Sequence, residues 1–140
     1  MITLYFWFVL KHFIVDFPLQ VPFMYKNKGI YGHIGGLVHA QFHGMATYII
    51  LLCITHNWWT AFDLSALDFI IHYHVDWAKM NLNKFEFTMS YVTKDTTKLI
   101  VDKREWKPDT SEYFWWLLGL DQFLHYMTYM LIIYLAVNWH

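Results

Sequence analysis

The chain has 140 residues, of which 57% are hydrophobic, 21% are aromatic and 15% are charged. Ordinary soluble domains carry about 25% charged residues, so this composition leaves too little charge to cover a soluble surface. The net charge of −1 does not indicate a nucleic-acid partner, and a single cysteine excludes an internal disulfide and multi-cysteine metal sites. The composition favours one membrane domain over residues 1–140, with the lipid bilayer as its partner.

The basic residues are confined to two stretches of the chain. Lys11, Lys26 and Lys28 lie near the start, and the remaining seven of the ten lie from Lys79 to Lys107. A soluble helix bundle would carry basic residues on the outer face of every helix. Lipid is therefore the better solvent for the two long segments that carry none, residues 29–78 and 108–140.

Hydropathy predicts an all-α integral membrane bundle of four transmembrane helices, over about residues 2–17, 30–54, 62–80 and 113–137. The first helix is short for a bilayer core of about 30 Å, and its Lys11 must snorkel or face protein. Asp63 is predicted to cap the third helix. One long polar loop, over about residues 81–112, joins the last two helices.

The connections predict the orientation of the bundle in the membrane. The first and third connections hold the basic residues, so the positive-inside rule places both in the cytoplasm and both termini outside. The long loop contains a roughly alternating run, Phe85 to Val92, which is typical of a small hairpin or of an interfacial cover.

Ionisable residues inside the predicted spans recur four positions apart, which places each row along one helix face. The rows are His12 and Asp16; His39 and His43; Asp68, His72 and Asp76; and Asp121 and His125. The first and third helices read His-x-x-x-Asp, and the fourth, which runs the opposite way, reads Asp-x-x-x-His. This reversal predicts a carboxylate layer near the cytoplasmic side, with a histidine layer about 5.4 Å deeper.

Three interpretations of the rows stay open. A His and an Asp in one row can pair with each other, which would make each row a polar clasp in lipid. The rows could also form a proton or ion relay. A cluster across helices is how bundle cores build metal sites, and imidazole with carboxylate suits zinc, then manganese or iron. The candidate metal ligands are His12, His39, His43, His72, Asp76, Asp121 and His125.

The common depth of the rows favours a membrane-embedded, metal-dependent hydrolase at the cytoplasmic leaflet. A divalent metal would make a bound water acidic enough to supply hydroxide at neutral pH. A carboxylate free of the metal would act as general base, and the catalytic candidates are Asp16, Asp76 and Asp121. Lys26, Lys28 and Lys79 are predicted to hold a phosphate, so the expected substrate is a lipid ester or a phosphoester.

The alternative is a non-enzymatic membrane protein. It would be a proton or ion relay, or an accessory or structural subunit of a membrane or phage–host complex, with the His/Asp pairs as polar clasps. The outer halves of three helices are apolar, which argues for a one-sided pocket and against a full channel. Gly32, Gly36, Ala40 and Gly44 form a small-residue stripe that favours close helix contact, either within the bundle or in a homo-oligomer.

The same segments carry a family resemblance. Residues 12–20, 39–43, 72–79 and 121–125 resemble an uncharacterised family, a domain of unknown function found in small multi-helix membrane proteins of bacteria and tailed phages. The resemblance implies a membrane location, expected to be a bacterial inner membrane, and further site members that we expect to bind substrate. These members are Gln20, Lys28, Lys79 and Gln122. A looser similarity connects the chain to membrane-bound metal-dependent hydrolases, whose Pro-Asp-x-Asp type segment it lacks.

Overall fold

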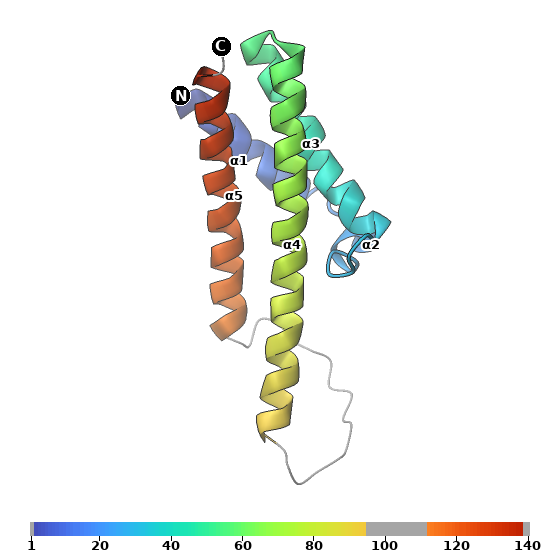
Figure 1. Ribbon diagram of the computed structural model, residues 1–140. Helices are drawn as coiled ribbons and strands as arrows, with labels where there is room; N and C mark the ends of the chain where they lie inside the picture. The colour runs from blue at the N-terminus through green and yellow to red at the C-terminus, as the bar shows by residue number, and fades with distance from the viewer. Residues whose placement is uncertain (1, 95–111, 139–140) are drawn as a thin grey trace.

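The computed structural model describes residues 2–94 and 112–138, including their side chains except those of residues 83–94. This part of the chain is all-helical and contains no strand. The helices are α1 (Ile2–Asp16), α2 (Pro22–Tyr25), α3 (Ile34–Thr55), α4 (Trp58–Lys94) and α5 (Glu112–Asn138). The single turn α2 interrupts the connection between α1 and α3, and the four long helices build the bundle (Figure 1).

The long helices form an up-and-down arrangement (Figure 1). α3 and α4 make an antiparallel hairpin, α5 packs beside α4, and α1 crosses behind them and contacts both α3 and α5. The start of α1, the turn between α3 and α4 and the end of α5 lie at one end of the bundle. We refer to it below as the terminal end.

Asn57 sets the start of α4. Its side-chain oxygen accepts hydrogen bonds from the backbone N–H groups of Trp59 and Thr60, at 3.0 and 3.3 Å, which is the geometry of a helix N-cap. The prediction that Asp63 caps this helix is therefore wrong, because the helix begins four residues before the predicted start. Asp63 is exposed within α4.

α4 also extends past its predicted end. The helix continues to Lys94, so residues 81–94 are helical and do not belong to the predicted loop. The run Phe85–Val92 is helical and makes no hairpin. No Gly or Pro occurs between residues 58 and 94, so nothing in the sequence interrupts the helix where it becomes polar. The rest of the predicted loop, residues 95–111, lies outside the described residues.

Two of the described helices are long and apolar enough to cross a membrane, namely α3 with a mean hydropathy of 1.5 and α5 with 1.2. Hydropathy therefore supports two of the four predicted transmembrane helices, α3 and α5. α1 has only 15 residues. In α4, the charges of Asp68 and Asp76 lower the mean hydropathy, although both side chains are buried inside the bundle.

Three members of the small-residue stripe, Gly36, Ala40 and Gly44, face the inside of the bundle, whereas Gly32 is exposed and precedes α3. A Cβ atom on Gly44 would lie 3.2 Å from the Phe69 Cβ and the Ser65 carbonyl oxygen, and one on Gly36 would lie 3.4 Å from the Tyr73 ring. The absence of side chains at Gly36 and Gly44 therefore lets α3 and α4 approach closely. The stripe therefore serves packing within the chain, the first of its two predicted uses.

An apolar core occupies the terminal end of the bundle. Its buried members come from all four long helices: Leu4, Phe8, Leu51, Ala61, Leu64, Tyr129, Ile132 and Ile133. Close packing of these side chains sets the relative positions of the helices. The same positions then determine which polar side chains meet farther along the bundle.

Candidate metal centre

The inward face of each long helix changes from apolar to polar with distance from the terminal end. All seven predicted metal ligands are buried: His12, His39, His43, His72, Asp76, Asp121 and His125. Their i, i+4 spacing places them on the face that the apolar core already turns inward. The structure therefore brings the four rows together in one place, while their role as ligands stays a prediction.

His72 lies at the centre of a cluster of imidazole rings. Its ring centroid is 3.5 Å from that of His43 and 4.1 Å from that of His125, and both pairs are stacked. The centroids of His39 and His12 lie 5.2 and 6.0 Å away. The stacking places the His72 ring of α4 between a ring of α3 and a ring of α5.

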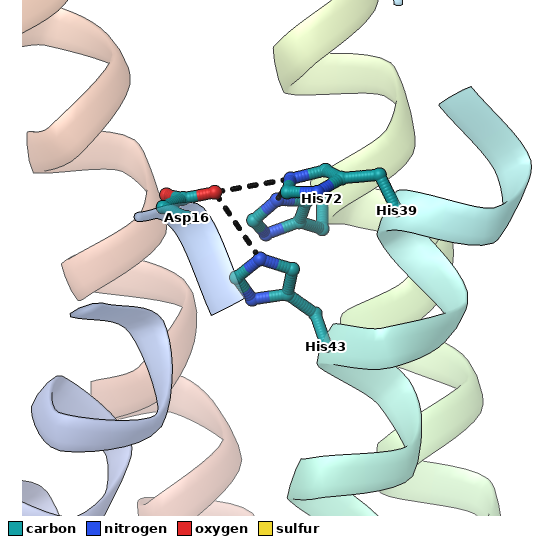
Figure 2. A group of neighbouring side chains, drawn as sticks. All are labelled: Asp16, His39, His43 and His72. Atoms are coloured by element: carbon teal, nitrogen blue, oxygen red, sulfur yellow. Dashed lines mark hydrogen bonds and ion pairs between the residues drawn. The ribbon is translucent and has the colours of Figure 1, made fainter. Parts of the chain in front are cut away.

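Asp16, the last residue of α1, joins histidines of two helices. One carboxylate oxygen, Oδ1, lies 3.0 Å from His39 Nε2 and 3.3 Å from His43 Nε2, and the other, Oδ2, lies 2.9 Å from His12 Nε2. Figure 2 shows the carboxylate directed toward the α3 histidines, with the His72 ring beside them. Asp16 therefore contacts three of the five clustered histidines.

Asp76 makes the corresponding contacts from α4. Its Oδ2 atom lies 3.3 Å from His39 Nε2 and 3.4 Å from His72 Nε2, and its Oδ1 atom lies 3.8 Å from His125 Nε2. The ammonium group of Lys28 lies 2.7 Å from Oδ2 and donates a hydrogen bond of 2.8 Å to His39. A positive group of the chain itself therefore lies between a carboxylate and an imidazole of the cluster.

Asp121 completes the carboxylate layer from α5. Its Oδ1 atom lies 3.5 Å from His125 Nε2. Its Oδ2 atom pairs with Lys79 at 2.7 Å and accepts a hydrogen bond of 3.2 Å from the Gln122 side chain. This carboxylate is thus shared between the cluster and a lysine near its edge.

The residues predicted to bind substrate have different positions. Lys28 and Lys79 pair with the carboxylates of the cluster, as described above, and Gln122 Oε1 lies 3.0 Å from His12 Nε2. Gln20 donates to the backbone oxygen of Asp16 at 2.7 Å. Lys26 is exposed on the segment after α2.

A second buried polar group lies one turn closer to the terminal end. The Lys11 ammonium lies 2.5 Å from Asp68 Oδ2, and Thr47 Oγ1 donates to the same oxygen at 2.6 Å. Lys11 also donates to the His43 carbonyl oxygen at 3.3 Å. Lys11 therefore faces protein, the second of the two predicted possibilities, and pairs with Asp68 outside the His/Asp cluster.

Sequence reasoning did not include Thr47 and Tyr129 among the polar residues of the interior. Tyr129 Oη lies 2.7 Å from His12 Nδ1. Thr47 follows His43 by four positions, and Tyr129 follows His125 by four. Extending each row by one more turn would have found both residues.

The donor atoms fit a divalent cation. Two groups of described side chains bring one ligand atom each to within 4.8 Å of one another: Asp16, His39, His43 and His72; and His72, Asp76 and His125. In a tetrahedral zinc site, with bonds of about 2.0–2.2 Å, ligand atoms lie about 3.3–3.6 Å apart. Within the first group, the Nε2–Oδ distances from Asp16 to His39 and His43 are 3.0 and 3.3 Å, and within the second, those from Asp76 to His72 and His125 are 3.4 and 3.8 Å.

Several buried atoms of the cluster have no hydrogen-bond partner. They include Asp121 Oδ1 and His125 Nε2, which lie 3.5 Å from each other. Atoms that lie close together without hydrogen-bond geometry converge on a shared point, as ligands around an ion do. His12 belongs to neither ligand group, and its bonds to Asp16 and Tyr129 make it an orienting residue for the cluster.

A shallow groove between α4 and α5 reaches the edge of the cluster. It has a volume of about 220 Å³, and leucines such as Leu117, Leu120 and Leu124 line it together with the Lys79–Asp121 pair. An apolar chain lying in this groove would bring a polar head group to the charged pair.

Comparison with known proteins gives one match. Residues 4–140 match the family described as "Protein of unknown function (DUF3307)". No curated protein and no solved structure matches the chain. The match covers almost the whole length of the sequence, including every helix that contributes to the cluster. The chain therefore belongs to the DUF3307 family.

Proposed function

We propose that this protein is an integral membrane hydrolase that depends on a divalent metal, with the His/Asp cluster as its centre. One observation carries the proposal: five histidines and three aspartates from four helices converge in the bundle interior. Burying so many polar groups is unfavourable unless a cation or an equivalent network binds them. Imidazole and carboxylate donors favour zinc, with manganese or iron as alternatives.

The outer surface supports a membrane location for all four long helices. Trp116 is 78% exposed on α5 and Ile70 is 51% exposed on α4, and similar apolar side chains cover α1. Asp68 and Asp76 of α4 point inward, whereas Asp63 is exposed near the start of the helix, so lipid would meet a mostly apolar surface along the rest of that face. With four passes, the positive-inside rule puts the α2 segment in the cytoplasm and both termini outside, as in a bacterial inner membrane.

This orientation has a direct test. Reporter fusions inserted between residues 95 and 111 should be cytoplasmic, and fusions after residue 138 should be extracytoplasmic. A cytoplasmic reporter at the C-terminal end would contradict the orientation.

The chemistry follows from where each side chain lies. When bound, a divalent ion makes a water acidic enough to supply hydroxide and stabilises negative charge on an ester or phosphoester. Asp16 is the most exposed carboxylate of the cluster, at 13% of its side chain. Its Oδ1 atom faces the histidines of the first ligand group, and its Oδ2 atom, which faces His12, would accept a proton from that water. Lys79 would hold an anionic head group, and the groove between α4 and α5 would hold the acyl chain.

Metal content and hydrolysis together test the proposal. Wild-type protein purified in detergent should contain stoichiometric metal and hydrolyse a lipid ester or a phosphoester in a substrate panel. His72→Ala removes a donor common to both ligand groups, and it should weaken metal binding by more than about 100-fold and abolish hydrolysis. His56→Ala, an exposed residue at the terminal end, is the control and should change neither.

The result that would overturn the proposal is equally concrete. If carefully purified wild-type protein contains no metal, and added zinc or manganese does not raise its melting temperature, the cluster does not bind a divalent cation.

A non-enzymatic role is the second candidate, and a specific observation favours it. Lys28 lies 2.7 Å from Asp76 and 3.9 Å from Asp16, and Lys79 pairs with Asp121, so each of the three carboxylates already has a cation of the chain beside it. In that case the rows are polar clasps or a proton relay in a membrane complex. Proton flux into vesicles containing the protein, lost in Asp76→Asn, would distinguish the relay from a clasp.

A further inference from the structure

We infer that the cluster is built for two divalent cations, bridged by the carboxylate of Asp76. The inference rests on the proposed metal-dependent function and specifies the number of ions and the ligands of each. The observation behind it is that the two oxygens of one carboxylate face different histidines.

The first position lies between α1 and α3. Asp16 Oδ1 is 3.0 Å from His39 Nε2 and 3.3 Å from His43 Nε2, and His39 Nε2 is 3.2 Å from His72 Nε2. Asp76 Oδ2 is 3.3 Å from His39 Nε2. His39 Nε2 accepts a hydrogen bond from Lys28, so it has no proton to donate to the two carboxylate oxygens, and a cation between these atoms would remove their repulsion.

The second position lies between α4 and α5. Asp76 Oδ1 is 3.8 Å from His125 Nε2, and Asp121 Oδ1 is 3.5 Å from the same nitrogen. His125 Nε2 and Asp121 Oδ1 are buried without a hydrogen-bond partner. These two atoms come from α5, and neither residue belongs to the first ligand group.

Asp76 connects the two positions because its two oxygens are divided between them. Oδ2 faces His39 and His72 of the first position, and Oδ1 faces His125 of the second. A bridging carboxylate holds two ions about 3.5–4 Å apart, the separation found in two-metal hydrolytic sites. His72 belongs to both ligand groups and lies between them.

Lys28 supports the cationic character of the first position. Its ammonium group contacts Asp76 Oδ2 and His39 Nε2 at 2.7 and 2.8 Å, the two atoms that the first ion would bind. The flexible lysine side chain can withdraw when an ion binds. The structure thus already has a positive group near the site that we assign to a metal.

Counting bound ions in the wild-type protein tests the inference. Protein in detergent is stripped with a chelator, loaded with Mn²⁺ and desalted, and its manganese is measured by elemental analysis and by electron paramagnetic resonance. We expect two ions per chain and a spectrum of magnetically coupled Mn²⁺. One ion per chain without coupling overturns the bridged pair and leaves a single-metal hydrolase, whereas no bound ion overturns the proposed function as well.

Three variants assign the two positions. His43→Gln should remove the first ion only and His125→Gln the second only, so each variant should fall from two ions to one and lose the coupled spectrum. His74→Gln changes an exposed histidine of α4 that contacts Tyr31 and not the cluster, and it should keep both ions. If His43→Gln and His125→Gln fold, as judged by helicity and a single elution peak, and keep two coupled ions, the assignment is wrong. If they do not fold, the wild-type ion count alone decides.

Discussion

The two halves of the bundle interior are made by the same helix faces and contain opposite chemistry. Along α3 the buried face reads His39, His43, Thr47 and Leu51, at four-residue steps from the cluster to the terminal end. The other long helices change in the same direction. Close packing stabilises the apolar half, whereas the polar half must satisfy its buried charges internally.

The comparison teaches that the apolar half acts as a scaffold and the polar half as the site. In the proposed membrane location, lipid would supply no hydrophobic driving force between helices, so shape and close contact would hold them together. The Lys11–Asp68–Thr47 group marks the boundary between the halves. Four substitutions, taken from the largest expected effect to the smallest, test how far the two halves are independent.

Breaking the boundary ion pair should have the largest effect. Lys11→Met leaves Asp68 buried and unpaired, and it should lower the free energy of unfolding by about 3–5 kcal/mol, measured by SDS titration in detergent. The double variant Lys11→Met, Asp68→Leu removes both charges and should recover most of that loss. If the double variant is no more stable than Lys11→Met, the ion pair contributes more than the neutralisation of a buried charge.

Weakening the apolar half should destabilise the protein without removing its metal site. Phe8 is fully buried against Tyr129, with ring centroids 5.3 Å apart. Phe8→Ala creates a cavity and should lower the free energy of unfolding by about 3 kcal/mol. The metal content of the folded fraction should stay at the wild-type value, because no ligand changes. A parallel loss of metal would show that the two halves are not separable.

Filling the contact between α3 and α4 should have a smaller effect. A Cβ atom on Gly44 would lie 3.2 Å from the Ser65 backbone oxygen, which has little room to move. Gly44→Ala should lower the free energy of unfolding by about 1–2 kcal/mol through overpacking. Ala46→Gly in the same helix is the matched control. It measures the Gly/Ala difference in helix propensity, about 1 kcal/mol, separately from the packing at Gly44. An equally stable Gly44→Ala would mean that the helices can separate there.

Removing the lysine within the polar half should strengthen metal binding. Lys28→Met leaves Asp76 without its ammonium partner, so an added divalent cation no longer competes with it. We expect metal affinity to rise about tenfold, equal to about 1.4 kcal/mol, measured by isothermal titration. Lys26→Met, an exposed lysine two positions away, should leave the affinity unchanged. Weaker binding in Lys28→Met would instead make Lys28 a structural part of the site.

The sequence by itself determined the helical class and the composition of the buried rows. Both depend on local periodicity, because residues four apart share a helix face whatever the helix packs against. The pairing of His72 with Asp76, and of Asp121 with His125, follows from spacing alone. The reversed order of the α5 row also predicted which polar side chains would lie at a common depth.

Only the tertiary structure decided which rows touch each other and through which atoms. That Asp16 meets His39 and His43, and that Lys11 meets Asp68, depends on the rotation and depth of separate helices. Packing between side chains far apart in the chain sets those quantities, and no local pattern encodes them. Hydropathy also did not predict where α4 begins and ends. The helix begins at the Asn57 cap, and it continues as helix through its polar C-terminal part.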